Sequence, residues 1–332
     1  MKKRFTAMKA VLAAVCVAVT SITAGSSALP QTAVADEYEE NGLKLWVYDC
    51  ETGEESTRIF HTSGTVPMET ELISASSFGN DDGGISTNAI IGSDDRTVVT
   101  NTTVAPYSYT CYMYSVYTDG NTSGIYSGFI IGPKAAVTVA HCAFNAGKTL
   151  DHIVVIPAVN VTTTPQSGPY GVAYSSSVIV PDAYINNPTW NDDWAVIELK
   201  SDIGNRTGWP SLESSSSSYN GTSVEVVGYP AKYDCSLQNK DTTFMISGKG
   251  KIRDSSIGIL DRGRGTMKGD WDGTDGDSGA PVFAYYNGMG YTIIGIHTGS
   301  SLTNGKPYGN STCFSAAARI SKDMYDYFMS YR

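Results

Sequence analysis

Short segments rich in valine, isoleucine, threonine and tyrosine recur along most of the chain, and glycine, asparagine, aspartate and serine separate them. In chain order, between residues 109 and 297, they read YTCYMYSVY, SGFIIG, AAVTVAHC, HIVVIPAV, SSVIV, WAVIEL, SVEVVGY, APVFAYY and YTIIGIH. β-Branched and aromatic residues favour strands, and strands at such regular spacing are typical of an all-β sandwich or barrel. YTDGNTSG at 117–124 predicts a hairpin loop. The pattern therefore predicts an all-β protein.

Helical spacing is confined to the carboxyl end of the chain. Apolar residues recur at helical intervals at Ile320, Met324, Tyr327, Phe328 and Tyr331. This period predicts one amphipathic C-terminal helix. The remaining length fits two β units of about a hundred residues each. We place the first at 89–200 and the second, with the helix, at 201–332.

The first 35 residues have the layout of a secretion signal. MKKR is the positive start, residues 10–19 are a short apolar run, and Ala-Val-Ala at 33–35 matches a cleavage site. The apolar run is too short for a transmembrane anchor. We therefore predict a signal peptide at 1–35 and a secreted, extracellular protein without a membrane partner.

Residues 36–88 differ in composition from the chain that follows. They open with the acidic run DEYEE and end with SSFGNDDGGISTN, a polar, glycine-rich stretch suited to a linker or processing site. We interpret this segment as a propeptide. The alternative is an ordinary N-terminal subdomain.

The composition excludes two classes of protein. Hydrophobic residues make up 41% of the 332 residues, which is enough for a sizeable core and argues against a disordered chain. The formal net charge of −10 argues against binding to a phosphate backbone. We therefore expect a folded protein with no nucleic-acid partner.

Five cysteines lie beyond the predicted signal peptide. They are Cys50, Cys111, Cys142, Cys235 and Cys313. No C-x-x-C pair occurs among them, so the sequence predicts no zinc site. An oxidising destination favours disulfides. Removal of Cys50 with a propeptide would leave four cysteines, which allow three connectivities.

Ser278 lies in the glycine-rich stretch GTDGDSGAPV, and a serine nucleophile there needs a base within hydrogen-bond reach. The chain has four histidines. His61 lies in the predicted propeptide, and His152 begins a strand in a setting typical of the surface. The candidates that remain are His141, which ends the β-rich run AVTVAHC, and His297.

The candidate acids are the two aspartates of NDDWAVIEL, Asp192 and Asp193, which directly precede an apolar strand. The α/β-hydrolase order of serine, acid and histidine fails, because residues 279–296 contain no acid. The subtilisin order needs helices that this sequence lacks. The order His141, Asp193, Ser278 on a β scaffold remains.

Three of these stretches, TVAHC, DWAVIEL and GDSGAPVF, resemble the signature regions of chymotrypsin-like serine proteases. Further stretches resemble the V8-like branch, the bacterial glutamyl endopeptidases: IIGSDDRTVVTNTTVAPY, IGPKAAVTVAHC, GYP and GIHTGS. The resemblance covers 89–332. It implies two six-stranded antiparallel β-barrels with the site in the cleft between them. It also implies a monomeric serine endopeptidase that needs no cofactor, forms an acyl-enzyme and acts on proteins or peptides.

The resemblance also supplies the roles of the catalytic residues, which we take over from the family template. Ser278 is the nucleophile, and His141 is the general base and later the acid. Asp193, which abuts the strand, fixes the imidazole tautomer. The N–H groups of Gly276 and Ser278 form the oxyanion hole.

In the glutamyl branch, the counterpart of His297 lines the S1 pocket and binds an acidic P1 side chain. Thr298 and Ser300 follow it, and Ser300 resembles a hydroxyl donor to that carboxylate. Many members carry threonine five residues before the nucleophile, where this chain has Gly273. Thr274 is the candidate substitute.

Two further aspartates depart from the glutamyl pattern. Asp272 occupies the position where trypsin-like enzymes select lysine or arginine, so trypsin-like cleavage is the alternative specificity. Asp277 is the residue that binds a freed α-amino group in chymotrypsin-like zymogens. We therefore hypothesise that cleavage beside Ala89 releases activity through an ion pair between Ile90 and Asp277.

The resemblance also suggests disulfides. A cysteine beside the catalytic histidine is bridged in the family, but its usual partner position holds Tyr126 here. We expect Cys142 to pair with Cys111 instead, and Cys235 with Cys313.

A catalytically inactive homologue that serves as a binding protein is the alternative of another class. The presence of all three triad residues and the signal–propeptide layout argue against it.

Overall fold

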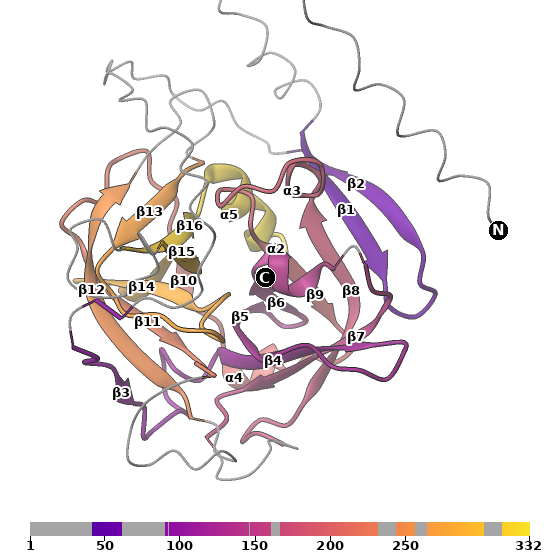
Figure 1. Ribbon diagram of the computed structural model, residues 1–332, viewed down its shortest axis with the longest axis horizontal. Coiled ribbons are helices and arrows are strands. Elements are labelled where there is room, and N and C mark those ends of the chain that lie inside the picture. Colours follow the sequence, from indigo (N-terminus) through magenta and orange to yellow (C-terminus); the bar gives the residue numbers. More distant parts are fainter. Residues whose placement is uncertain are drawn as a thin grey trace, which may run out of the picture.

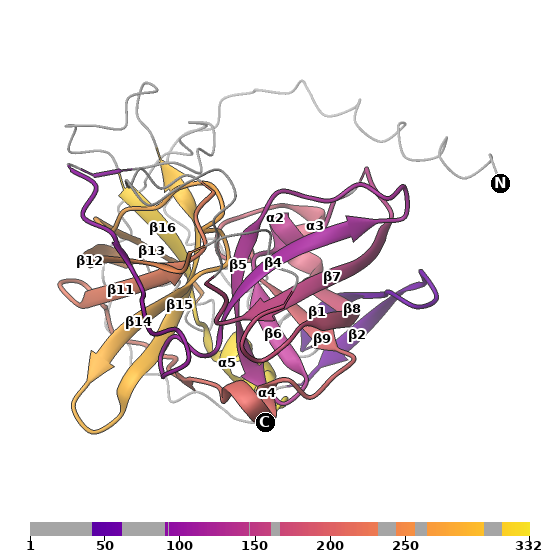
Figure 2. The same ribbon diagram turned by 90° about the horizontal axis from the view of Figure 1, so that it is seen from below.

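The computed structural model describes residues 42–61, 90–91, 93–145, 147–160, 167–231, 244–255, 264–301 and 314–332. Strands dominate this part of the chain and form two sheets that lie side by side (Figure 1; Figure 2). Among the described residues, no helix is long and apolar enough to span a membrane.

The first sheet has the strand order β2-β1-β8-β7-β4-β5-β6-β9. Its members are β1 (Leu43–Asp49), β2 (Glu55–Phe60), β4 (Thr110–Tyr117), β5 (Tyr126–Gly132), β6 (Ala135–Thr138), β7 (Leu150–Pro157), β8 (Ala173–Pro181) and β9 (Ala195–Leu199). Pairing of β8 with β9 closes β4 to β9 into a six-stranded antiparallel barrel. β1 and β2 lie outside this closed ring.

The second sheet has the order β10-β15-β14-β11-β12-β13-β16, and β3 pairs with β12. Its members are β3 (Thr97–Val98), β10 (Ser211–Leu212), β11 (Ser223–Gly228), β12 (Ile246–Ser255), β13 (Thr266–Gly269), β14 (Pro281–Tyr286), β15 (Gly290–Ser301) and β16 (Phe314–Arg319). Pairing of β15 with β16 closes the second six-stranded antiparallel barrel. The predicted fold of two such barrels is confirmed.

The helices are short. They are α2 (Ala140–Ala143), α3 (Asp182–Asn186), α4 (Gly204–Thr207) and α5 (Lys322–Met329). α5 is the predicted C-terminal helix, and it begins where the Ser321 hydroxyl accepts a hydrogen bond from the Met324 N–H at 3.2 Å. It buries Met324, Tyr327 and Phe328 in the core of the first barrel.

Part of the predicted propeptide belongs to the first sheet. β1 and β2 form a hairpin whose first strand pairs with β8. Leu43, Leu45 and Val47 alternate along β1 and are buried, so the strand presents one face to the core. The proposed cleavage at the end of 36–88 stays a prediction.

The predicted Cys111–Cys142 disulfide is wrong. In the described part of the chain, Cys50, Cys111 and Cys142 are all free thiols. The Cys142 carbonyl meets Ser115 of β4, whose Oγ donates to it at 3.4 Å. Four residues of strand separate Ser115 from Cys111, which places Cys111 roughly 13 Å further along β4. Cys235 and Cys313 lie outside the described residues.

Candidate active site

His141 lies on the single turn of helix α2 that directly follows β6. Its ring connects two residues that are distant in the sequence. Nδ1 lies 2.7 Å from Asp193 Oδ2, and Nε2 lies 3.1 Å from Ser278 Oγ. The structure thus brings the three predicted catalytic side chains into one hydrogen-bonded chain. The His141 side chain remains 32% exposed, so this chain is open on one side.

Asp193 rather than Asp192 faces His141. Its second oxygen, Oδ1, accepts from the His141 backbone N–H at 2.9 Å, so one carboxylate holds both the ring and the backbone of that residue. Asp192 turns elsewhere, to Thr189 and to Arg264. The next residue, Trp194, packs edge-on against Phe328 of α5, with ring centroids 5.4 Å apart. The C-terminal helix therefore anchors the acid.

Ser278 is presented by a tight loop that needs glycine on both sides. Gly276 has φ +98° and Gly279 has φ +88°, values that favour glycine. A Cβ on Gly276 would lie 2.4 Å from the Tyr229 carbonyl oxygen, and one on Gly279 would lie 2.1 Å from the Ser127 carbonyl oxygen. The backbone there packs too closely for any side chain.

Ser127 of the first barrel holds this loop of the second barrel. Its hydroxyl donates to the Gly276 carbonyl at 2.7 Å, and its N–H donates to the Ser278 carbonyl at 2.8 Å. Within the described residues, the N–H groups of Gly276 and Ser278 themselves have no protein acceptor. Both carbonyls are therefore fixed, and both amides remain available to a substrate oxygen. This role of Ser127 could not be predicted from the sequence, because it depends on how the two barrels pack together.

Burial by itself lowers the pKa of His141, but neighbouring groups reverse the effect. The charges of Cys142 and Asp193, and hydrogen bonds to both, raise the pKa of His141 well above its ordinary value. His141 therefore keeps its proton up to a higher pH than an ordinary histidine does, and it can act as a base only above that pH. We therefore expect the acid side of an activity profile to lie above pH 6.5, the ordinary pKa of histidine.

His297 is 1% exposed on β15 and has a defined tautomer. The Trp271 indole N–H, which can only donate, reaches His297 Nδ1 at 3.2 Å. Nδ1 is therefore the acceptor, and Nε2 carries the proton of the neutral ring. Burial, aided by the nearby His141, lowers the pKa of His297 to about 4. Trp271 was not predicted, although it lies only two residues before Gly273 in the sequence.

Gly273 explains the departure from the family's threonine. A Cβ at this position would lie 2.9 Å from His297 Nε2 and 3.0 Å from Cε1, which is too close. Glycine thus leaves room for the imidazole. The sequence comparison with the glutamyl branch identified the position but not this reason for its glycine.

The other predicted S1 residues divide into two groups. Ser300 is fully buried and lies 3.2 Å, hydroxyl to hydroxyl, from Ser315, while the Thr298 hydroxyl donates to the Ala316 carbonyl at 3.3 Å. Both follow His297 on β15. Thr274 is placed differently, because its hydroxyl accepts from Arg96 Nη1 at 2.9 Å. The same arginine pairs with Asp277, so this contact of Thr274 is with the Arg96–Asp277 ion pair and not with His297.

The two remaining aspartates face the segment that precedes β3. Asp272 accepts from the backbone N–H groups of Ile91 at 2.6 Å and Asp95 at 3.4 Å. Asp277 forms an ion pair with Arg96 at 3.4 Å, in which both side chains are less than a tenth exposed. Burial raises the pKa of each aspartate to about 6. Asp277 therefore has a buried cation as its partner while the chain is intact.

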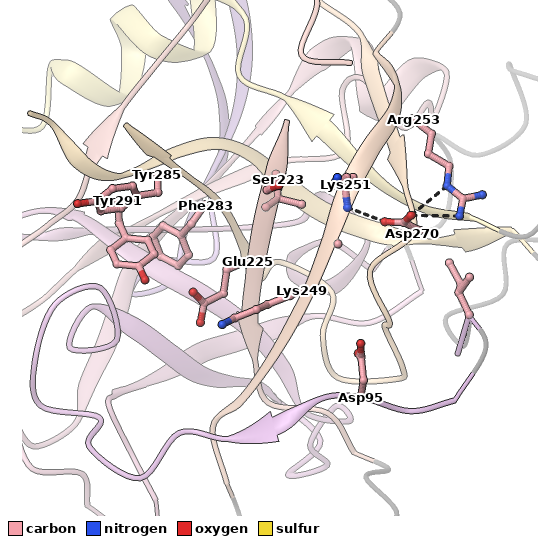
Figure 3. A pocket seen from close by; sticks show the side chains of 13 residues that line it. Asp95, Ser223, Glu225, Lys249, Lys251, Arg253, Asp270, Phe283, Tyr285 and Tyr291 are labelled. Carbon is pink, nitrogen blue, oxygen red and sulfur yellow. Dashed lines mark hydrogen bonds and ion pairs between the residues drawn. The ribbon is translucent and has the colours of Figure 1, made fainter. Parts of the chain in front are cut away.

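A groove of about 600 Å³ is lined by residues of β11, β12, β14 and β15 of the second barrel, and none of the three triad residues is among them (Figure 3). Lys249, Lys251 and Arg253 of β12 line it together with Tyr285 and other residues. Arg253 is paired with Asp270 at 3.1 Å, so part of this charge is offset. Among the described residues, no group of three or more His, Cys, Asp or Glu side chains could hold a metal ion.

Comparisons with known proteins agree with this geometry. The family model described as Trypsin matches residues 96–320. A glutamyl endopeptidase of Bacillus licheniformis is 32% identical over 73% of this chain and 68% of its own length. A protein of Bacillus subtilis named extracellular metalloprotease is 30% identical over 72% of this chain and 68% of its own length.

Among solved structures, a Glu endopeptidase in complex with MPD superposes with a TM-score of 0.56 at 22% identity. The match covers 73% of this chain and 98% of that one, and it supports the fold. The family match covers most of the two barrels and includes all three residues of the hydrogen-bonded chain. The chain therefore belongs to the trypsin family of serine proteases, and it is a serine endopeptidase.

Proposed function

We propose that Ser278, His141 and Asp193 carry out peptide-bond hydrolysis and that the enzyme cleaves after glutamate or aspartate. The hydrogen-bonded chain from Asp193 through His141 to Ser278 supports the catalytic assignment. The fixed, neutral His297 supports the specificity. We further propose that the protein is exported and acts as a monomer on protein or peptide substrates.

The reaction has two halves that share one base. His141 Nε2 takes the proton of Ser278 Oγ while that oxygen bonds to the substrate carbonyl carbon. The N–H groups of Gly276 and Ser278 stabilise the negative oxygen that forms. His141 then gives its proton to the leaving amine as the C–N bond breaks. In the second half, a water gives its proton to His141 and attacks the ester, and Ser278 recovers the proton as the acid leaves.

Asp193 has an electrostatic and orienting role. Its hydrogen bond to Nδ1 keeps the Nε2 lone pair directed at Ser278, and its charge stabilises the imidazolium that forms in each half-reaction. An Asp193→Asn variant should lose about 10⁴-fold in kcat, as in the chymotrypsin-like template from which this role is taken.

The specificity proposal depends on the Nε2–H of His297. With Nδ1 occupied by Trp271, Nε2–H is the donor that the ring can offer to a substrate carboxylate. A carboxylate placed there would raise the pKa of the ring and strengthen the contact. Trp271→Phe removes the indole donor, so we expect a higher KM for glutamyl substrates with less effect on kcat.

The trypsin-like alternative would need a free carboxylate at Asp272. Both oxygens of Asp272 already accept backbone N–H groups, from Ile91 and Asp95, and the side chain is only 4% exposed. This arrangement favours the acidic P1 preference.

Two measurements test these proposals. The secreted protein should react with a fluorophosphonate probe, and Ser278→Ala should not; an unlabelled native protein would contradict the catalytic assignment. Cleavage-site mapping on a mixed peptide library should give cuts after glutamate or aspartate, and His297→Ala should weaken them. Cuts after lysine or arginine would overturn the specificity proposal and leave the catalytic assignment intact.

A further inference from the structure

The β1–β2 hairpin occupies an edge that the first barrel leaves open. β7 pairs with only the first residues of β8, through Val154 with Tyr174 and Val155 with Ala173. β1 pairs with the later part of the same strand, from Ser177 to Pro181. Without β1, that stretch of β8 would expose unpaired backbone groups, which favour the addition of another strand.

Apolar side chains make this contact a continuation of the core. Leu45 is fully buried and Leu43 is 5% exposed, and both belong to the same packed cluster as the barrel interior. Val47, opposite Ile179 in the register, is 7% exposed. Tyr48 adds a buried hydrogen bond from its hydroxyl to the Leu150 carbonyl at 2.7 Å, which fastens the hairpin to β7 as well.

The hairpin also reaches two helices. Trp46 packs edge-on against Phe144, with ring centroids 5.0 Å apart, and Phe144 directly follows the helix that carries His141. Phe60 packs against Tyr327 of α5 at the same distance. Arg58 forms an ion pair with Glu198 of β9 at 3.0 Å. The hairpin is thus bound to the barrel along its whole length.

These contacts leave the catalytic residues uncovered. Among the described residues, no hydrogen bond, ion pair or ring contact joins residues 43–60 to His141, Asp193 or Ser278. The hairpin lies on the outer side of the barrel, next to β8 (Figure 1). It therefore has the contacts of a structural element and not those of a plug in the cleft.

We propose that the edge of β8 that β1 covers is a binding surface for this hairpin and that the hairpin stays bound after the chain is cut before Ile90. The mature protease is then a complex of two pieces, a small β-hairpin and the double barrel. The inference rests on the proposed export and processing for its biological setting. What it asserts physically is that the contact between β1 and β8 is strong enough to hold the hairpin without a covalent link.

The test uses the full chain with Ser278→Ala, which cannot digest itself. A cleavage sequence for an unrelated, site-specific protease is introduced between residues 62 and 89, and the protein is cut and passed through a native sizing column. We expect the fragment that contains residues 42–61 to elute with the barrels and to separate only in denaturant. Elution of the fragment on its own would overturn the proposal.

Variants locate the contact. Val47→Asp puts a charge into the buried face and should weaken retention by about tenfold or more. Ser56→Asp, on the exposed strand β2, is the matched control and should retain the fragment. Val47→Ala serves if the aspartate variant does not fold before cutting. Full retention of the fragment in a folded Val47→Asp variant would show that the hairpin is not held to β8 through this buried face, and would overturn the proposed surface.

Because the readout is binding by an inactive protein, the result does not depend on the protease assignment. A protein that fails to cleave substrates but retains its hairpin would contradict only the proposed function. A protein that cleaves glutamyl bonds but releases its hairpin would contradict only this inference.

Discussion

Two segments that precede the first barrel are held in different ways. The hairpin at 43–60 is bound to the first sheet by buried apolar side chains and by backbone pairing. The segment at 93–98 is bound to the second barrel by buried charge, since Arg96 lies between Asp94 and Asp277. Apolar contact gives strong but geometrically tolerant attachment, whereas a buried ion pair fixes particular atoms.

The difference separates stability from catalysis. Arg96 contacts Asp277, the neighbour of Ser278, and also donates to Thr274 in the same loop. It therefore supplies within the intact chain the buried cation that we had assigned to the freed amino group of Ile90. Among the described residues, no hydrogen bond or ion pair joins the hairpin to the loop that carries Ser278. Changes in the two segments should have different consequences.

The largest effect is expected from Arg96→Ala. It leaves the Asp277 carboxylate buried without its cation, which costs about 3–5 kcal/mol. We expect a loss of that size in the free energy of unfolding, measured by denaturant titration, together with a fall in active-site labelling. Lowering the pH should restore part of the stability, because Asp277 can then be protonated.

Two controls accompany this variant. Arg96→Lys keeps the charge but not the planar fork and should give an intermediate loss. Arg253→Ala removes an arginine that is half exposed and should change the free energy of unfolding by less than about 1 kcal/mol. Full labelling of Arg96→Ala would show that the loop does not need this cation.

The second effect concerns the hairpin. Leu45→Ala removes a fully buried side chain and should cost about 2–5 kcal/mol of stability in the intact chain. The kcat of the folded variant should stay close to that of the parent, because the triad is not touched. Thr57→Ala, on the exposed strand beside it, is the control. A large loss of kcat in Leu45→Ala would erase the distinction between the segments.

A smaller effect should be visible in the pH dependence of stability. The pKa of Asp272 is raised from 3.8 to about 6, so the folded protein binds the proton more tightly than the unfolded chain. This contribution to the free energy of unfolding is present below pH 3.8 and is lost as the pH rises through about 6. The decrease in the free energy of unfolding across this range is about 3 kcal/mol, and Asp272→Asn should remove it.

His297 opposes that trend. Its pKa is lowered from 6.5 to about 4, so its contribution is lost as the pH falls through about 4. Denaturant titrations at several pH values should therefore show a more positive slope in Asp272→Asn than in the parent. An unchanged slope would contradict the raised pKa of Asp272.

The smallest effect is expected from Arg58→Ala. The Arg58 side chain is 44% exposed, and an ion pair such as that with Glu198 typically contributes about 0.2–1 kcal/mol. Thermal unfolding should shift only slightly and less at high salt. A loss as large as that of Leu45→Ala would show that charge also holds the hairpin.

Sequence patterns predicted those strands of the barrels that consist mainly of apolar residues. Each of the nine segments recognised in the sequence overlaps an observed strand. The strand β12 was missed because ISGKGKIRDS carries lysine, arginine and glycine, and only its neighbours β11 and β13 make it a strand. β1 was missed despite the alternation of LKLWVYD, because its acidic surroundings indicated a propeptide.

In the active site too, residues in local motifs could be predicted and residues that act through contacts between distant segments could not. The positions of His141, Asp193 and Ser278 could be predicted because each lies in a short motif with a fixed place beside a strand. Ser127 and Arg96 could not, because their contacts arise where segments distant in the sequence pack together. The cysteine pairing failed for a related reason, since it depends on which stretch of β4 faces α2.

The hydrogen bond from Trp271 to His297 has a consequence for substrate capture. With the ring neutral at physiological pH, an arriving carboxylate meets the dipole of an N–H group instead of a full positive charge. Attraction of this kind acts only at short range. Under the proposed specificity, the contribution of this ring should therefore depend little on ionic strength, and its discrimination should arise from contact after arrival and not from long-range steering.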